Sequence, residues 1–306
     1  MSFSSEVKSE LISVIPRSMH CKYAELAGII AVNGRIEETE EGERFIIRAE
    51  NDALENKIRK LSSFVISEGS DYLELLNEKL HHRKLIIKDS DIKDKYFTKL
   101  KLTQNINHVL VNDLLTVRSC CKQSYLRGAF LAGGSVGSPD KNYQLSIICR
   151  DKTETEKLLR LAESLHLAFK LQKRNNGYAV YIKDGDTISG FLAAVGAANC
   201  VMEFENVRIL KDIRNNVNRE VNCDTANMAK TADAAAKQLD DIRFIIKQGS
   251  FDELPDNLKT VALARLEFPL LSIKELGEEL SPQLSKSCIN HRMRKISAIA
   301  DALRKE

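Results

Sequence analysis

Residues 26–34 read Leu-Ala-Gly-Ile-Ile-Ala-Val-Asn-Gly, and residues 126–134 read Leu-Arg-Gly-Ala-Phe-Leu-Ala-Gly-Gly. Each stretch is mostly apolar and carries glycine at its third position and at its end, which predicts a short buried helix. A terminal glycine is typical of a left-handed C-cap, so we expect that conformation at Gly34 and Gly134. The two stretches lie 100 positions apart, which indicates an internal duplication.

The glycines inside these helices need a structural reason. Glycine in a helix interior costs about 1 kcal/mol relative to alanine. The missing side chain allows two helix backbones to approach closely. We therefore predict that the two helices pack on each other at Gly28 and Gly128.

The residues after each copy predict a similar succession of elements. Strands are expected at 35–39, 44–49, 72–76 and 84–88 in the first half and at 143–149, 169–173 and 178–183 in the second, with helices at 52–67, from 91, 153–165 and 187–195. One strand that the repeat requires before residue 143 is not visible in the sequence. The predicted fold is α+β, with a duplicated αββαββα unit followed by an all-α domain.

The composition of the chain excludes several classes of protein. The 306 residues are 43% hydrophobic and 29% charged, which argues against a disordered chain or a coiled coil. The apolar run at 191–200 is well short of the roughly 18 residues of a membrane span, so we exclude membrane insertion. Residues 1–15 read as an amphipathic helix rather than a signal peptide, and we expect a cytoplasmic protein.

The seven cysteines and six histidines show no local metal-binding pattern. No CxxC or HExxH occurs, so we predict no metal site and no cofactor. The adjacent Cys120 and Cys121 are compatible with redox sensing or with a coincidence at a helix start, and we favour the second.

The last 55 or so residues predict a compact three-helix unit. Leu258, Val261, Ala262 and Leu266 follow helical spacing up to Pro269. The sequence Ser272-Ile273-Lys274-Glu275 is a capping box that starts a short second helix, and Ser285 starts a third after a turn at 281–284. This succession is typical of a helix-turn-helix.

The third helix combines an apolar stripe with a basic face. The stripe contains Ile289, Met293, Ile296, Ala300 and Leu303. The candidate DNA-binding residues lie at the helix start, on the opposite face and on its flanks: Ser285, Lys286, Ser287, Asn290, His291, Arg292, Arg294 and Lys295. Arginine and asparagine suit base edges, whereas lysine and the helix N-terminus suit phosphate. A solvated basic face on a three-helix bundle is the alternative, and we favour DNA binding.

Charge is distributed unevenly in this unit. Residues 252–280 carry seven acidic and three basic side chains, whereas residues 281–306 carry six basic and two acidic ones. A positive segment beside a negative one favours a polyanion-binding face, although the net charge of the chain is only +3. For the polar stretch 206–247, a structural connector and a contact with the DNA minor groove or phosphates remain equal alternatives.

The two nine-residue copies resemble LAGLIDADG, the interface helix of homing endonucleases, and the copy at 26–34 does so more clearly. In that family each motif has an acidic residue before its last glycine, and the two carboxylates hold divalent metals. The corresponding positions here are Asn33 and Gly133, neither of which supplies a carboxylate. The resemblance therefore implies a degenerate motif without nuclease chemistry.

The whole chain resembles the WhiA family of bacterial regulators. Besides the two motifs and the helix-turn-helix, the stretches that carry the resemblance are 2–11, 125–130, 214–219 and 285–287. The resemblance implies four segments: LAGLIDADG-like halves at 1–103 and 104–200, a helical linker at 201–250 and a helix-turn-helix domain at 251–306.

The same resemblance implies a sequence-specific transcription regulator that binds double-stranded DNA, is not an enzyme and is associated with the nucleoid. Roles in sporulation or in cell division and chromosome segregation, and contact with other transcription proteins, are also implied. Two alternatives are a metal-dependent endonuclease that uses displaced acidic residues, and a DNA-tethered platform that binds a protein or a ligand.

Overall fold

The computed structural model describes residues 2–40, 42–66, 83–105, 108–175 and 177–305. The chain forms two compact units, Met1–Lys211 and Asp212–Glu306. Each unit has a hydrophobic core of its own, and the two cores share no residue. The strand expected at 72–76 lies outside the described residues.

The first half of the N-terminal unit builds a five-stranded antiparallel sheet of order β3-β2-β1-β5-β4. Its elements are α1 (Phe3–Ser13), α2 (Met19–Asn33), β1 (Gly34–Thr39), β2 (Gly42–Arg48), α3 (Asp52–Ile66), β3 (Lys84–Ile87), α5 (Ser90–Lys99), β4 (Leu102–Asn105) and β5 (His108–Val111). The sequence analysis predicts no strand at the positions of β4 and β5. Both have only four residues, and three of the four in β4 are exposed, so β4 shows no hydrophobic pattern and the alternation of β5 is too short to stand out.

The second half forms a four-stranded antiparallel sheet of order β6-β7-β9-β8. After the short helix η1 (Asp113–Thr116), its elements are α6 (Ser119–Gly133), β6 (Gly134–Val136), β7 (Leu145–Cys149), α7 (Lys152–Glu163), β8 (Lys170–Arg174), β9 (Gly177–Ile182) and α8 (Gly185–Val195). This is the predicted αββαββα order. The strand that the sequence did not reveal is β6, which has only three residues.

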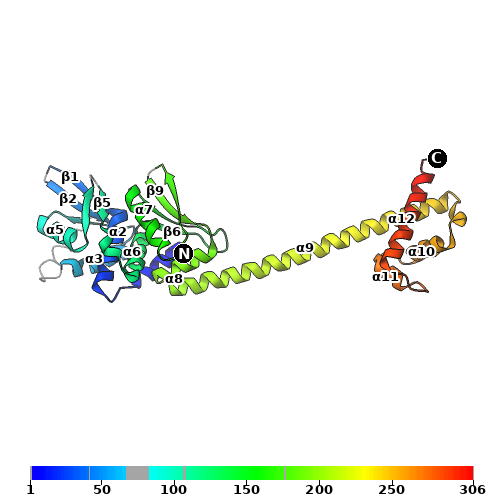
Figure 1. Ribbon diagram of the computed structural model, residues 1–306, viewed down its shortest axis with the longest axis horizontal. Coiled ribbons are helices and arrows are strands. Elements are labelled where there is room, and N and C mark those ends of the chain that lie inside the picture. Colours follow the sequence, from blue (N-terminus) through cyan, green and yellow to red (C-terminus); the bar gives the residue numbers. More distant parts are fainter. Residues whose placement is uncertain (1, 41, 67–82, 106–107, 176, 306) are drawn as a thin grey trace. The chain divides into compact units, whose positions relative to one another are not determined.

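Helices α2 and α6 pack against each other, and Figure 1 shows them between the two sheets. A Cβ atom at Gly28 would lie 2.2 Å from the Tyr125 carbonyl oxygen, and one at Gly128 would lie 2.0 Å from that of Glu25. Both distances are far shorter than van der Waals contact. The two backbones therefore meet at a separation that only glycine permits.

The expected left-handed C-caps at Gly34 and Gly134 are wrong. Their φ angles are −78° and −85°, and each helix passes directly into a strand. Glycine is needed there for space, because a Cβ atom would lie 2.5 Å from the carbonyl oxygen of Ile30 or of Phe130. The same requirement recurs in both copies of the repeat.

A buried ion cluster links the two halves. The carboxylate of Glu25 contacts Lys57 Nζ at 2.6 Å and Arg127 Nη2 at 2.8 Å, and all three side chains are buried. Lys57 also donates to the carbonyls of Leu11 and Val14. Burial lowers the pKa of Lys57, and the charge of Glu25 opposes that shift. Removing one member of such a cluster would leave an unpaired buried charge, which is strongly destabilising.

The C-terminal unit is helical. It contains most of α9 (Ala198–Lys247), followed by η2 (Phe251–Glu253), α10 (Asp256–Glu267), α11 (Ile273–Glu278) and α12 (Lys286–Leu303). Its core joins Ile242 and Ile245 of α9 to apolar side chains of the three following helices. None of the helices in the described part of the chain combines the length and hydropathy that a membrane span needs.

Candidate nucleic-acid interface

The turn between α11 and α12 is defined by local contacts. Ser272 caps α11: its hydroxyl accepts a hydrogen bond from the Glu275 amide, and Glu275 accepts one from the Ser272 amide at 2.8 Å. The hydrogen bond from the Ser272 amide lowers the pKa of Glu275. The Gly277 carbonyl accepts from the Leu284 amide, and a Cβ atom at Gly277 would lie 2.2 Å from the Leu284 carbonyl oxygen. The turn can therefore fold tightly against α11.

Helix α12 has the two-sided character that the sequence predicts. Ser285 is its N-cap and accepts a hydrogen bond from the Cys288 amide. Ile289, Met293, Ile296 and Ala300 are buried in the core of the unit, and Leu303 is partly buried against it. This packing fixes the rotation of α12 about its axis.

The candidate residues of α12 differ in exposure. Those with exposed side chains are Ser285, Lys286, Ser287, His291, Arg294 and Lys295. Asn290 is half-buried. Arg292 is also half-buried and donates to the Asn257 carbonyl at 3.1 Å, which ties α12 to the start of α10. In this conformation Arg292 supports the domain, while the exposed residues face solvent.

The basic face of α12 is not neutralised by neighbouring acidic residues. Within the described part of the C-terminal unit, the ion pairs involve Lys259, Lys274 and Arg304 as cations. Arg304 contacts the buried Asp241 of α9 at 2.8 Å and so closes the end of the domain. Lys286, Arg294 and Lys295 take part in none of these pairs, which leaves their charge available to a polyanion.

A small cavity of about 210 Å³ adjoins the start of α12 and gathers further bases. Lys230 of α9, Lys274 of α11 and Lys286 of α12 all line it. Sequence reasoning missed Lys230 and Lys274 as members of this surface, because they are 56 and 12 positions from Lys286 and only the fold brings them together. The second half of α9 thus adds charge to the face of α12.

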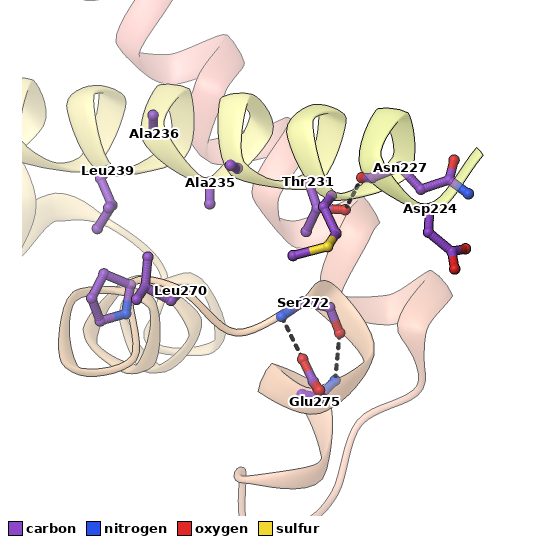
Figure 2. Close-up of a pocket in the computed structure, with 12 residues that line it drawn as sticks. Asp224, Asn227, Thr231, Ala235, Ala236, Leu239, Leu270, Ser272 and Glu275 are labelled. Carbon is purple, nitrogen blue, oxygen red and sulfur yellow. Dashed lines mark hydrogen bonds between the residues drawn. The ribbon is translucent and has the colours of Figure 1, made fainter. Parts of the chain in front are cut away.

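A wider groove of about 770 Å³ lies between α9 and the residues around the start of α11. Figure 2 shows Leu239 and Ala235 of α9 on one side and Leu270 with the Ser272 and Glu275 capping box on the other. Leu270 is 89% exposed, so this groove is an open apolar surface.

The degenerate motif positions lie at the C-terminal ends of α2 and α6. The Asn33 side-chain amide donates to the carbonyls of Arg48 and Ala132 at 3.2 and 3.1 Å. A Cβ atom at Gly133 would lie 2.6 Å from the Ile148 carbonyl oxygen, so no side chain fits there without rearrangement. An amide donor and a bare backbone do not form a site for Mg²⁺ or another hard divalent metal, which prefers carboxylate ligands.

The opposite ends of the same helices carry a cluster that the sequence did not predict. His20, Cys21, Cys120 and Cys121 place one nitrogen and three sulfur atoms within 4.8 Å of one another. The prediction of no metal site rested on spacing along the chain, which cannot reveal a cluster whose members lie 100 positions apart. The signal that would have found it is the duplication itself, since the two dipeptides occupy equivalent positions in the two copies.

Comparison with known proteins covers both units. The family model of the WhiA LAGLIDADG-like domain matches residues 122–214, and that of the WhiA C-terminal HTH domain matches residues 217–300. A probable cell division protein WhiA from Desulfitobacterium hafniense (strain DSM 10664 / DCB-2) is 37% identical over 100% of this chain and 98% of its own length. A protein of the same name from Lachnospira eligens is 38% identical over 99% of this chain and 98% of its own length.

The crystal structure of full-length WhiA from Thermatoga maritima matches with a TM-score of 0.55 and 24% sequence identity, covering 99% of both chains. This likeness shows that the chain has the same fold, a LAGLIDADG-like domain together with a helix-turn-helix domain.

Proposed function

The chain belongs to the WhiA family, and on this basis we propose that it is a sequence-specific regulator of transcription that binds double-stranded DNA and does not cleave it. The observation that carries the proposal is the exposed basic face of α12, with Arg294 and Lys295 outside the ion pairs of its domain. A helix-turn-helix presents such a face to the major groove.

The expected contacts of each residue with bases or phosphates follow from its position along α12. Asn290 and Arg294 lie one helical turn apart and suit base edges. Ser285, Lys286 and Ser287 lie at the helix start, where free amides and a lysine suit phosphate. Lys230 extends the phosphate-binding surface around the same cavity, which Lys274 also lines while it pairs with Glu278. His291 and Lys295 flank the proposed readout positions.

The biological role is inferred from relatives. Proteins 37% and 38% identical to this chain are called probable cell division proteins. We infer that this chain acts at the nucleoid on genes of cell division or chromosome segregation, or of sporulation in a host that sporulates. Asn33 and Gly133 support a role without catalysis, because neither position offers the carboxylate that metal-dependent cleavage requires.

The test uses full-length protein and a duplex selected from a random pool. We expect Arg294→Ala to weaken binding to the selected site by about 1–3 kcal/mol while random duplex is bound almost as before. Lys286→Ala should weaken both alike and reduce the slope of log affinity against log salt by about one. Lys305→Ala is the matched control, because it removes the same charge beyond the C-terminal end of α12.

Equal losses on both duplexes for Arg294→Ala would show that α12 does not read bases. The same titrations also test whether the protein cleaves DNA. With Mg²⁺ or Mn²⁺ present, the bound duplex should remain intact, and site-specific cleavage that EDTA abolishes would contradict the proposal.

A further inference from the structure

Two dipeptides from equivalent positions of the duplication meet at the start of the paired helices. His20-Cys21 lies in the first turn of α2 and Cys120-Cys121 in the first turn of α6. His20 Nδ1 lies 3.1 Å from Cys121 Sγ and 3.2 Å from Cys21 Sγ. Because α2 and α6 pack on each other, residues 100 positions apart form one cluster.

We propose that His20, Cys21, Cys120 and Cys121 bind one zinc ion. Three thiolates and one imidazole are a donor set typical of structural zinc. The four ligand atoms lie within 4.8 Å of one another. Zinc–sulfur bonds of about 2.3 Å at a tetrahedral angle place neighbouring ligand atoms about 3.7 Å apart, so small side-chain adjustments complete the site.

The surroundings of the cluster suit a bound cation. Cys21 and Cys121 are buried, His20 is half-buried and Cys120 is exposed, which gives an ion a path from solvent.

This site differs from the metal positions of the LAGLIDADG motif. Those positions, Asn33 and Gly133, end α2 and α6, whereas the cluster begins them. Fifteen residues of helix separate the two ends by about 22 Å. Zinc at the cluster would therefore take no part in phosphate chemistry at the degenerate motif. It would cross-link the two halves beside the close contact at Gly28 and Gly128.

The experiment uses the full chain without a histidine tag, purified in a thiol reductant and without chelators. We expect about one zinc ion per chain by elemental analysis. Replacement by Co²⁺ should produce the thiolate charge-transfer bands and the intense visible bands of a tetrahedral site. Removing the metal with a chelator should lower the melting temperature of the chain, and adding zinc back should restore it.

Cys120→Ser is the decisive variant, because the side chain is exposed and the fold should tolerate the change. We expect its zinc affinity to fall about tenfold or more while its circular dichroism spectrum is retained. Cys223→Ser, which changes an exposed cysteine of α9, is the control and should bind zinc as the unmodified chain does.

Three results would overturn the proposal. The first is a chain that carries no zinc and gives no tetrahedral Co²⁺ spectrum. The second is equal zinc binding by the Cys120→Ser and Cys223→Ser variants. The third is a disulfide among Cys21, Cys120 and Cys121 in protein prepared under reducing conditions, which would identify the cluster as a redox pair instead.

Discussion

At the scale of single residues, contacts across the duplication hold the N-terminal unit together. Gly28 and Gly128 set the distance between α2 and α6, and Glu25 pairs with Lys57 and Arg127 beneath that contact. In the second half, Lys157 occupies the position equivalent to Lys57 and likewise donates a hydrogen bond to a backbone carbonyl, that of Val111. The glycines are visible as a sequence pattern, whereas the partners of the buried charges are not.

We expect Gly128→Ala to destabilise the N-terminal unit by about 3 kcal/mol, because the added methyl group meets a backbone oxygen that cannot move alone. Gly190→Ala in α8 is the matched control. Its nearest neighbour would be 3.4 Å away, so the higher helix propensity of alanine should leave stability unchanged or raise it by up to about 1 kcal/mol. Urea denaturation measures both. A loss for Gly190→Ala as large as that for Gly128→Ala would contradict the explanation.

The buried carboxyl group of Glu154 should make the stability of the folded state depend on pH. Burial raises its pKa above the ordinary 4.5, although hydrogen bonds from Tyr125 and the Val111 amide oppose the shift. The folded state therefore holds this proton more tightly than the unfolded state. The resulting stabilisation is complete below about pH 4.5 and is lost as the pH rises through the folded-state pKa.

Glu154→Gln removes that titration and can keep both hydrogen bonds. We therefore expect the variant to gain stability relative to the unmodified chain as the pH rises from about 4.5. Urea denaturation at several pH values between about 4.5 and 8 measures the difference. A difference that is independent of pH, or that changes in the opposite direction, would show that burial does not control this carboxyl.

At the scale of elements, local signals predict the C-terminal helices well. The Ser272 capping box, the Ser285 N-cap and the apolar stripe of α12 are confirmed, because each depends on residues within a few turns. Short strands are harder to predict. β6 has three residues and β4 and β5 have four each, so their existence depends on hydrogen bonds to neighbouring strands rather than on their own pattern.

The capping box should contribute measurably because α11 has only six residues. We expect Ser272→Ala to lower the free energy of unfolding of the C-terminal unit by about 1 kcal/mol, since amides at the start of α11 lose their acceptor. Ser297→Ala is the control, because it makes the same change inside α12, where alanine has the higher helix propensity, and it should cost little. Hydrogen exchange at the amides of α11 should become faster only in the first variant, and equal exchange in both would argue against the cap.

At the scale of the whole molecule, two separate cores predict two folding units. Ile242 and Ile245 of α9 belong to the same core as α10, α11 and α12, and Asp241 pairs with Arg304. We expect a fragment of residues 212–306 to unfold cooperatively and to keep the site preference of the full chain, with lower affinity. A fragment of residues 251–306 lacks those partners and should be largely unfolded.

Circular dichroism during heating and DNA titration of the two fragments measure the outcome. A cooperative transition and site-specific binding by residues 251–306 alone would show that α9 is dispensable for the domain. Loss of folding in residues 212–306 would contradict the independence of the two cores.

The sequence by itself determined the duplication, the close helix pair, most helices and the basic face of α12. The duplication follows from two similar stretches 100 positions apart, whose internal glycines predict the close helix pair. The other helices and the basic face follow from periodicity, caps and composition, which act over a few residues. Only the tertiary structure decided that Gly34 and Gly134 are extended, that Lys230 and Lys274 join Lys286, and that His20, Cys21, Cys120 and Cys121 meet. The two glycines are extended because each begins a strand of a sheet. The lysines and the His-Cys cluster come together from distant positions in the sequence or from different helices, and spacing along the chain does not predict such distances.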